Sequence, residues 1–140
     1  MPAKVTDYMA TKVIYIAPDT GARDAFFTMR EHGIRHLPVV GGDGKLEGIV
    51  SDRELRRPDW VDEARDLAHV YYLDDDMLVR DVMIKHVHVV HTYDTLRKAA
   101  RVLVDHHVGA VPVLDKTESL VGMLSAVDLL RALSDMIDQQ

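Results

Sequence analysis

The hydrophobic and polar positions of this chain follow two alternating periods, which predict short strands and amphipathic helices in a regular order. Early in the chain, apolar runs rich in β-branched residues flank a stretch in which Ala22, Phe26 and Met29 share one helical face. Gly33 follows this stretch, where a left-handed helix cap is expected. The pattern predicts strand, helix, strand, strand and helix at residues 13–16, about 21–32, 37–40, 46–50 and from Ser51.

The same order of elements recurs later in the chain. Shifting the sequence by 74 positions aligns residues 5–56 with residues 79–130 without a gap, and roughly a quarter of the aligned pairs are identical. The second copy predicts a strand at 87–90, a hairpin across 115–119 and a last helix from about Ala126. Its first helix has an apolar stripe that consists of Leu96, Ala99, Ala100 and Leu103. The chain is therefore predicted to be one α+β (mixed α/β) module of two βαββα repeats.

We assign residues 1–57 to the first repeat, residues 79–140 to the second and residues 58–78 to the segment that connects them. Four apolar residues at helical spacing predict a connecting helix in this segment: Trp60, Ala64, Leu67 and Tyr71. Three aspartates follow at 74–76, and adjacent carboxylates on a linker are more often solvated than bound to metal.

Composition and charge exclude several classes of function. The net charge of -6 disfavours a general nucleic-acid surface, which needs clustered Lys and Arg. The chain has no cysteine, which rules out disulfides and thiolate metal sites and fits a reducing compartment. The first residues lack the apolar stretch of a secretory signal, and no apolar run approaches the roughly 20 residues of a membrane span. We expect a cytoplasmic protein that binds neither membrane nor nucleic acid.

A hydroxyl and a carboxylate stand three residues apart where the last helix of each repeat is predicted to begin. These residues are Ser125 and Asp128 in the second repeat, and Ser51 and Glu54 in the first. A carboxylate there can accept hydrogen bonds from the two hydroxyls of a ribose, while the free backbone N–H groups of the helix end favour a phosphate. The same spacing also forms a capping box, in which the two side chains bond each other's backbone. Both interpretations stay open on the sequence.

The motifs taken together resemble the cystathionine-β-synthase (CBS) domain family in its tandem form, the Bateman module. Each repeat has a Val-x-Asp-x-Met start, an apolar-Pro-Val strand and a Gly-x-x-Ser-x-x-acid turn, in the same order. The resemblance extends from Val5 to about Leu133 and includes the small stand-alone prokaryotic CBS pairs of the acetoin-utilisation type. It implies two repeats related by a pseudo-two-fold axis, with ligand clefts between them.

The resemblance also implies that an adenosine compound such as AMP, ADP, ATP or S-adenosylmethionine is the ligand. By position, the residues that match the family's ribose contacts are Ser125, Asp128, Ser51 and Glu54. Those that match its adenine wall are Lys85, His86, Val87, Val111 and Pro112, and in the first repeat Lys12, Val13, Leu37 and Pro38. Whether magnesium accompanies the nucleotide stays open.

Two departures from the family's pattern separate the two expected clefts. Glu54 stands where Asp is usual, and its extra methylene would push the carboxylate about 1 Å further into a small pocket. Gly109 and Ala110 stand in the second repeat where the first has the basic pair Arg35 and His36, so the second repeat lacks its own cations.

These departures are complementary, and we therefore expect one good site. Ser125 and Asp128 would hold the ribose there. The phosphate would be bound by Arg35 and His36, which reach from the other repeat, with help from Arg131. A solvated basic pair at a strand start is the alternative for Arg35 and His36.

The chain contains no Walker A loop, no nucleophile elbow and no HExxH motif, so we do not expect an enzyme. We expect a regulatory module that signals to an effector protein when nucleotide binding changes its conformation. A ligand-free structural scaffold is one alternative. A histidine-rich metal site is another, and its ligands would be His86, His88 and His91. Homodimerisation is implied by the family and favoured by apolar positions of the last helix, namely Leu129, Leu130, Leu133 and Ile137.

Overall fold

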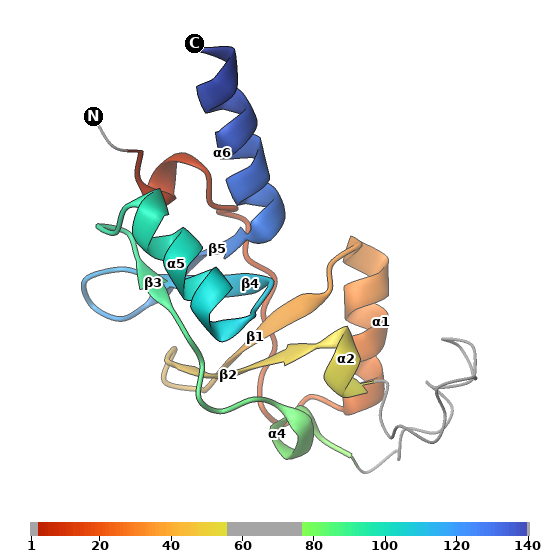
Figure 1. The fold of residues 1–140 in the computed structure, drawn as a ribbon. Coiled ribbons are helices and arrows are strands. Elements are labelled where there is room, and N and C mark those ends of the chain that lie inside the picture. The colour runs from red at the N-terminus through yellow and green to blue at the C-terminus, as the bar shows by residue number, and fades with distance from the viewer. Residues whose placement is uncertain (1–2, 56–76, 140) are drawn as a thin grey trace. The chain divides into compact units, whose positions relative to one another are not determined.

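The boundaries between folded units in this protein do not coincide with the boundaries between its sequence repeats. A computed structural model describes residues 3–55 and 77–139, which form two compact units. Unit 1 consists of Met1–Val13 and His88–Gln140, and unit 2 of Ile14–Val87. The red N-terminal segment in Figure 1 therefore belongs with the cyan and blue elements of the second repeat. The predicted connecting helix over residues 60–71 and the aspartates at 74–76 lie outside the described residues.

The described residues of unit 2 form a helix, a hairpin and two short helices. Its elements are α1 (Ala22–His32), β1 (His36–Val40), β2 (Leu46–Ser51), α2 (Asp52–Leu55) and α4 (Val79–Val82). α1 ends at Gly33, whose φ of 65° is the left-handed cap that the sequence predicts. β1 and β2 pair antiparallel, from His36 opposite Ser51 to Val40 opposite Leu46. The predicted helix, hairpin and short helix of the first repeat are confirmed.

Unit 1 has the corresponding elements of the second repeat. They are η1 (Val5–Asp7), β3 (Val90–His91), α5 (Leu96–His106), β4 (Ala110–Leu114), β5 (Leu120–Ser125) and α6 (Ala126–Asp138). β4 pairs antiparallel with β5 on one side and parallel with β3 on the other. The bounds of α5, β4 and β5 follow those of α1, β1 and β2 by 74 residues each. The period of the sequence is therefore also the period of the fold.

The strands predicted at 13–16 and 87–90 are mostly wrong. In unit 2 the only ladder contact of the first run is an isolated parallel bridge between Ile16 and Val39. In unit 1 the second run reaches its partner only at Val90, which pairs with Val113. Both runs span the points at which the chain passes from one unit to the other, so most of their residues have no neighbouring strand.

The first residues of each sequence repeat pair with the hairpin of the other repeat. We call these two stretches, residues 5–13 and 79–87, the exchanged segments. In unit 1 the backbone of Ala10 exchanges two hydrogen bonds with that of Met123, of 2.8 and 3.0 Å. In unit 2 Ile84 and Ile49 make the same two bonds, also of 2.8 and 3.0 Å. The start of each repeat thus lies against the hairpin of the other repeat.

A glycine in each hairpin makes this close approach possible. A Cβ added at Gly122 would lie 2.6 Å from Met9 Sδ and 3.0 Å from the carbonyl oxygen of Ala10. At Gly48 the corresponding distances are 2.7 Å to Met83 Sδ and 2.9 Å to the carbonyl oxygen of Ile84. Any side chain at either position would therefore push the exchanged segment away from the hairpin.

Each unit has a hydrophobic core of its own, built from its helices and the inner face of its hairpin. The core of unit 1 includes Val5, Val90, Leu103, Val111, Val113 and Leu124. The core of unit 2 includes Ala25, Phe26, Met29, Leu37, Val39 and Val50. Val5 and Val79, which belong to the exchanged segments, are fully buried in them, so the exchange is part of the packing and not a surface contact.

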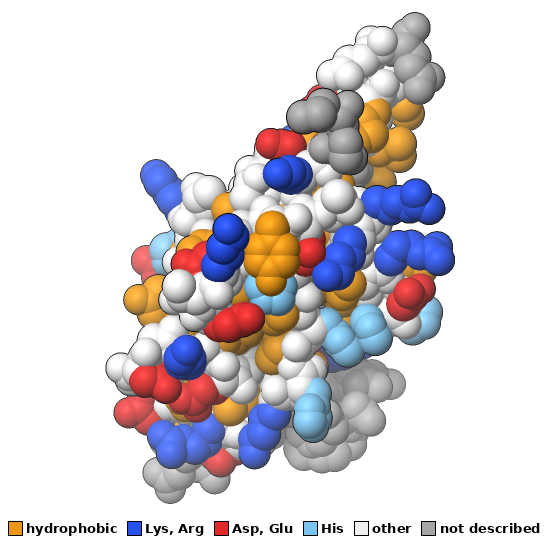
Figure 2. Space-filling view, turned by 90° about the vertical axis from the view of Figure 1, so that its left-hand side faces the viewer, with side chains coloured by type: hydrophobic (Ala, Val, Ile, Leu, Met, Phe, Trp, Pro, Cys, Tyr) orange, Lys and Arg blue, Asp and Glu red, His pale blue; other side chains and the backbone are white. Residues whose placement is uncertain are grey.

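α6 leaves apolar side chains at the surface. Leu129 packs against the core of unit 1, whereas Leu130, Leu133 and Ile137 are 63%, 52% and 59% exposed. Figure 2 shows hydrophobic side chains among acidic and basic ones on the face that it presents. Within the described ranges, neither α6 nor any other helix is both long and apolar enough to cross a lipid bilayer.

Candidate functional site

The start of α6 brings Ser125 and Asp128 together. β5 ends at Ser125, whose φ of -115° and ψ of 166° are extended, and the helix begins at the next residue. Asp128 Oδ2 accepts hydrogen bonds from Ser125 N at 2.9 Å and from Ser125 Oγ at 3.1 Å. The backbone N–H of Asp128 donates to Ser125 Oγ at 3.2 Å. The capping box, one of the two interpretations of this pair, is therefore present.

The capping box uses only one oxygen of the Asp128 carboxylate. Asp128 Oδ1 lies 3.1 Å from Arg131 Nη2, and the Asp128 side chain is 12% exposed while that of Arg131 is 60% exposed. A carboxylate has about four acceptor positions, so this one retains capacity beyond the bonds that it makes. The partner that limits access to Oδ1 is a solvated guanidinium, and ion pairs of that kind are weak. Asp128 can therefore present Oδ1 to a diol if Arg131 moves aside.

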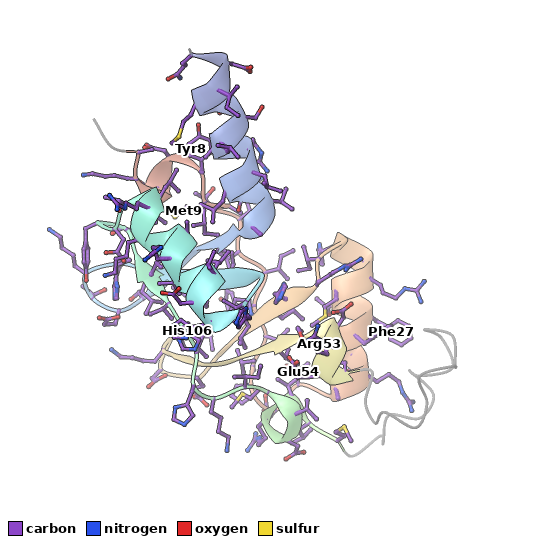
Figure 3. The ribbon with its side chains drawn as sticks, viewed as in Figure 1. Tyr8, Met9, Phe27, Arg53, Glu54 and His106 are labelled. Atoms are coloured by element: carbon purple, nitrogen blue, oxygen red, sulfur yellow. The ribbon has the colours of Figure 1, made fainter. Side chains whose placement is uncertain are left out.

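The corresponding pair in unit 2 makes the same two bonds. Both the backbone N–H and the Oγ of Ser51 donate to Glu54 Oε1, at 2.8 and 2.7 Å. The longer side chain of Glu54 therefore still reaches back to Ser51, as that of Asp128 does to Ser125. Figure 3 shows Glu54 beside Arg53 on the short helix α2.

The residues predicted to contact adenine are divided between the units by the exchange. Lys12 and Val13 lie in unit 1, with Ser125 and Asp128 of the second repeat. Lys85, His86 and Val87 lie in unit 2, with Ser51 and Glu54 of the first repeat. Each of these segments is therefore in the same unit as the hairpin of the other sequence repeat. The bridges of Ala10 and Ile84 set the partner hairpin of each segment.

The apolar residues of the predicted adenine wall differ in what their side chains contact. Leu37 and Val111 are 0% and 1% exposed and belong to the hydrophobic cores of their units. Pro38 and Pro112 follow them in β1 and β4 and are buried as well. Because successive strand residues point to opposite faces, the two prolines lie on the sheet face opposite to the core leucine and valine. Of these four residues, the prolines are therefore the ones whose side chains face away from the cores.

Arg35 and His36 lie next to the Ser51 pair of their own unit. The carbonyl oxygen of Arg35 accepts a hydrogen bond from Asp52 N at 3.0 Å, and His36 is opposite Ser51 in the hairpin. Burial is the main reason that the pKa of His36 lies below its usual 6.5, and the charge of Arg35 acts in the same direction. Asp52 and Glu54 oppose this shift. A reach of these cations to the Ser125 pair stays a prediction.

The lowered pKa of His36 predicts that acid destabilises the fold. The native state favours the neutral imidazole, so His36 contributes stability above its unfolded pKa of 6.5, and this contribution is lost as the pH falls through the lower folded value. The free energy of unfolding should therefore drop between about pH 7.5 and about pH 5.5, and less so in His36→Gln. Urea titrations at both pH values measure this difference. His32→Gln, at an exposed position of α1, is the control, and an equal drop in all three proteins would contradict the assignment.

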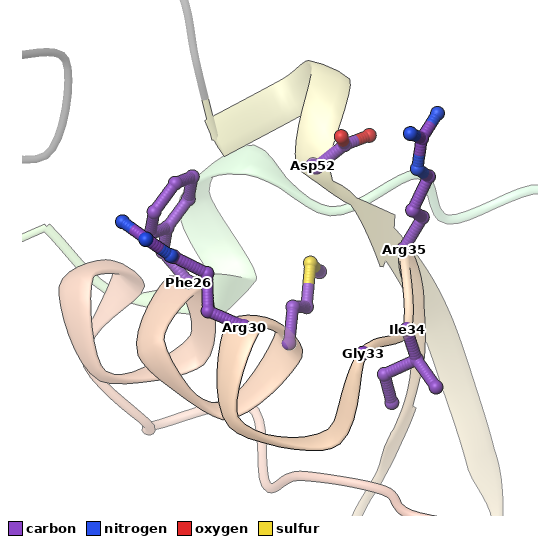
Figure 4. Close-up of a pocket in the computed structure, with 7 residues that line it drawn as sticks. Phe26, Arg30, Gly33, Ile34, Arg35 and Asp52 are labelled. Atoms are coloured by element: carbon purple, nitrogen blue, oxygen red, sulfur yellow. The ribbon is translucent and has the colours of Figure 1, made fainter. Parts of the chain in front are cut away.

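A cavity of about 320 Å³ opens beside Arg35 in unit 2. Apolar side chains of Phe26, Met29 and Ile34 line it, together with Arg30, Arg35 and Asp52. Figure 4 shows Arg35 and Asp52 on one side of this cavity and Arg30 on the other. The volume is at the lower end of the range for small-ligand pockets, so Arg35 borders a space that a small anion could enter.

A family model for the CBS domain matches residues 5–58 and 79–135, which together are most of the chain. The chain belongs to the CBS domain family. The match covers both sequence repeats, and the expectation of two CBS repeats is confirmed.

Relatives of similar length are themselves CBS proteins. A CBS domain-containing protein of Dictyostelium discoideum is 30% identical over 99% of this chain and 96% of its own length. The structure of CBSX2 in complex with AMP is 29% identical, has a TM-score of 0.79, and is matched over 96% of this chain and 98% of that one. The AcuB protein of Vibrio cholerae, named for acetoin utilization, is 28% identical with a TM-score of 0.77, over 99% and 95% of the two chains.

Other relatives carry the CBS region as a small part of a longer protein. A homoserine O-acetyltransferase of Methanocorpusculum labreanum is 32% identical over 91% of this chain, but the match covers 24% of that enzyme. The match to an inosine-5'-monophosphate dehydrogenase of Korarchaeum cryptofilum covers 23% of that enzyme at 28% identity. The chain thus spans about a quarter of these enzymes, and their activities are not carried over to it.

The three histidines of the metal alternative are divided between the two units. His86 is in unit 2, whereas His88 and His91 are in unit 1. The ring of His88 stacks on that of His106 with centroids 3.6 Å apart, and His91 Nε2 lies 3.1 Å from Glu118 Oε2. In the part of the chain that the structure describes, no three potential ligands gather in a metal-binding group.

Two contacts of α6 were not predicted. The pair of Asp128 and Arg131 could have been found, because residues three apart on a helix are neighbours. A hydrogen bond of 2.7 Å from Tyr8 Oη to Asp135 Oδ2 joins residues that are 127 positions apart. No local sequence signal marks that contact.

Proposed function

We propose that this CBS pair binds an adenine nucleotide or a related adenosine compound at the start of α6 and regulates a partner protein. The observation that carries the proposal is the Ser125–Asp128 pair at a helix N-terminus, with a nearly buried carboxylate and a guanidinium 3.1 Å away. The AMP complex of CBSX2, which is similar over nearly its whole length, supports the choice of ligand.

In the proposed site, a nucleotide would replace the ion pair between Asp128 and Arg131 with bonds of its own to each residue. The two vicinal hydroxyls of a ribose can donate to a carboxylate, and bonds to a charged acceptor are among the stronger hydrogen bonds. When a ribose takes Asp128 Oδ1, the Arg131 guanidinium is released and can bind a phosphate. The first N–H groups of α6, which is 13 residues long, favour the same negative charge. Lys12 and Val13 of unit 1 are the proposed adenine contacts.

Unit 2 provides the elements of a second, weaker site in this proposal. Ser51 and Glu54 would take the ribose there, with Lys85, His86 and Val87 near the base. The Glu54 side chain is one methylene longer than that of Asp128, so its carboxylate would stand about 1 Å further into the pocket. Arg35 and His36 are proposed as phosphate contacts, and the cavity beside Arg35 supports access by an anion.

The ligand and the output are proposed only by class. AMP, ADP, ATP and S-adenosylmethionine all present the adenosine that the site would recognise, and magnesium would accompany only the polyphosphates. We propose a non-enzymatic, cytoplasmic role, because no catalytic motif is present and the lack of cysteine fits a reducing compartment. We further propose that a second copy or an effector protein packs against the exposed apolar residues of α6.

A thermal-shift panel tests the proposal directly. Adenosine compounds should raise the unfolding temperature while guanosine and cytidine compounds should not, because saturation at 100 times the dissociation constant stabilises by about 2.7 kcal/mol. Arg35→Ala tests the phosphate contact proposed for unit 2. It should remove part of the shift with AMP, because Arg131 still binds the phosphate in unit 1, and leave the shift with adenosine unchanged. If no adenosine compound stabilises the protein, the scaffold alternative is favoured.

A further inference from the structure

Tyr8 is the residue through which the N-terminal segment of unit 1 bonds the side of α6. Its phenolic oxygen donates to Asp135 Oδ2 at 2.7 Å. Figure 3 shows Tyr8 and Met9 beside α6. The bond is the main reason that the pKa of Tyr8 lies above its usual 10.0, with Arg131 acting in the opposite direction. The phenol therefore stays protonated, and able to donate, at any pH below about 10.

Asp135 lies on the same helix face as the proposed ribose site. Asp128, Arg131 and Asp135 are spaced three and four residues apart on α6, so they form one row along its surface. The row begins at the capping box of Ser125 and ends at the bond to Tyr8.

Three successive residues of the N-terminal segment contact the rest of unit 1. Tyr8 bonds Asp135, Met9 packs its sulfur over Gly122, and Ala10 pairs with Met123. Two residues further on, this segment reaches the proposed adenine contacts Lys12 and Val13. The residues proposed to contact the base and those proposed to contact the ribose thus come from distant parts of the sequence. The N-terminal segment sets the distance between them.

In the described part of unit 2, the second and third of these contacts have counterparts. Met83 packs over Gly48, and Ile84 pairs with Ile49. Val82 stands at the position of Tyr8, shifted by 74 residues. A valine has no hydroxyl to donate, so residue 82 cannot make this hydrogen bond.

We propose that Tyr8 is a positioning residue, which fixes the adenine-binding segment against α6 and makes the nucleotide site of unit 1 the tighter of the two. The inference rests on the proposed function and adds to it a cause for the inequality of the two sites. Tyr8 acts through Asp135 and the segment that follows it, and it needs no contact with the nucleotide.

Calorimetric titration of the full chain with AMP tests this role. Tyr8→Phe should weaken the binding step that Asp128→Asn also weakens, by about three- to tenfold, as expected for losing one hydrogen bond. Asp135→Ala should have the same effect. Asp135→Asn should retain near wild-type affinity, because the amide oxygen can still accept from Tyr8. Tyr15→Phe and Asp138→Ala, which change an exposed tyrosine of unit 2 and an exposed acid of α6, are the matched controls.

The outcomes separate this inference from the proposed function. If Tyr8 has only a structural role, its variant unfolds more readily but the folded protein binds AMP as wild type does, and the inference is overturned. A failure of Asp135→Asn to restore affinity overturns it as well. If the wild-type chain binds no adenosine compound, the proposed function fails and the inference with it. Hydrogen exchange at Ala10 and Met123 then still reports whether Tyr8→Phe loosens the segment.

Discussion

Asp128→Ala is expected to weaken AMP binding by about ten- to hundredfold, because each hydrogen bond to a charged group contributes about 1.5–3 kcal/mol. The ribose would lose its acceptor, while the apolar contacts and the helix N-terminus would remain. Isothermal titration of AMP into the wild-type and variant chains measures this loss directly.

Asp128→Asn separates this effect from a loss of stability. Alanine also removes the capping box, which costs about 1 kcal/mol of stability, whereas asparagine can still accept from the N–H of Ser125. The asparagine variant should unfold at nearly the wild-type temperature and still bind AMP more weakly. Unchanged affinity in both variants would mean that Ser125 and Asp128 serve only as a helix cap.

Gly122→Ala is expected to destabilise unit 1 by about 1–3 kcal/mol, the usual cost of overpacking. The added methyl group would lie 2.6 Å from Met9 Sδ and 3.0 Å from the carbonyl oxygen of Ala10, and the second of these atoms is backbone. The exchanged segment would have to move away from β5, which weakens the two hydrogen bonds between Ala10 and Met123. Urea denaturation measures the change in the free energy of unfolding.

Two further glycines provide matched comparisons for this prediction. Gly48→Ala places a methyl group 2.9 Å from the carbonyl oxygen of Ile84 and should destabilise unit 2 by a similar amount. Gly42→Ala adds a methyl group with no atom within 4 Å and should be nearly neutral. Equal stability of all three variants would show that the hairpins do not need glycine for the exchange.

The helices and hairpins were predictable because the signals that form them are local. The face of α1 that carries Phe26 and Met29 is set by helical spacing. Gly33 ends the helix because glycine adopts the left-handed conformation of a C-terminal cap without strain. The strands predicted at 13–16 and 87–90 failed because a strand needs a partner as well as an apolar run. Where those runs cross from one unit to the other, only Ile16 and Val90 begin a ladder contact.

The exchange of segments between the repeats could not be predicted from the sequence, for a related reason. The pattern around Ala10 and Ile84 is the same in both repeats, so it indicates that each segment meets a hairpin but not which hairpin. Pairing with the other repeat satisfies the same two backbone hydrogen bonds as pairing within a repeat would. Chain geometry decides between them, and that geometry is not encoded in any local spacing.

The candidate site was predictable only as far as its residues are neighbours in sequence. Ser125 and Asp128 meet because they are three apart at a helix start. Val111 is buried in the core of unit 1, which the alternation along a strand could have indicated, and its place in an adenine wall stays a prediction. Tyr8 lies too far along the chain from Asp135 for any pattern to link them.

The most direct test of the account is an NMR titration of the full chain with AMP, observed at the backbone amides. The account predicts that the amides of Ser125, Ala126 and Asp128 shift together with those of Lys12 and Val13, and that all of them saturate at one ligand concentration. Amides at the start of α6 that do not respond while AMP binds elsewhere, or do not respond to any adenosine compound, would contradict it.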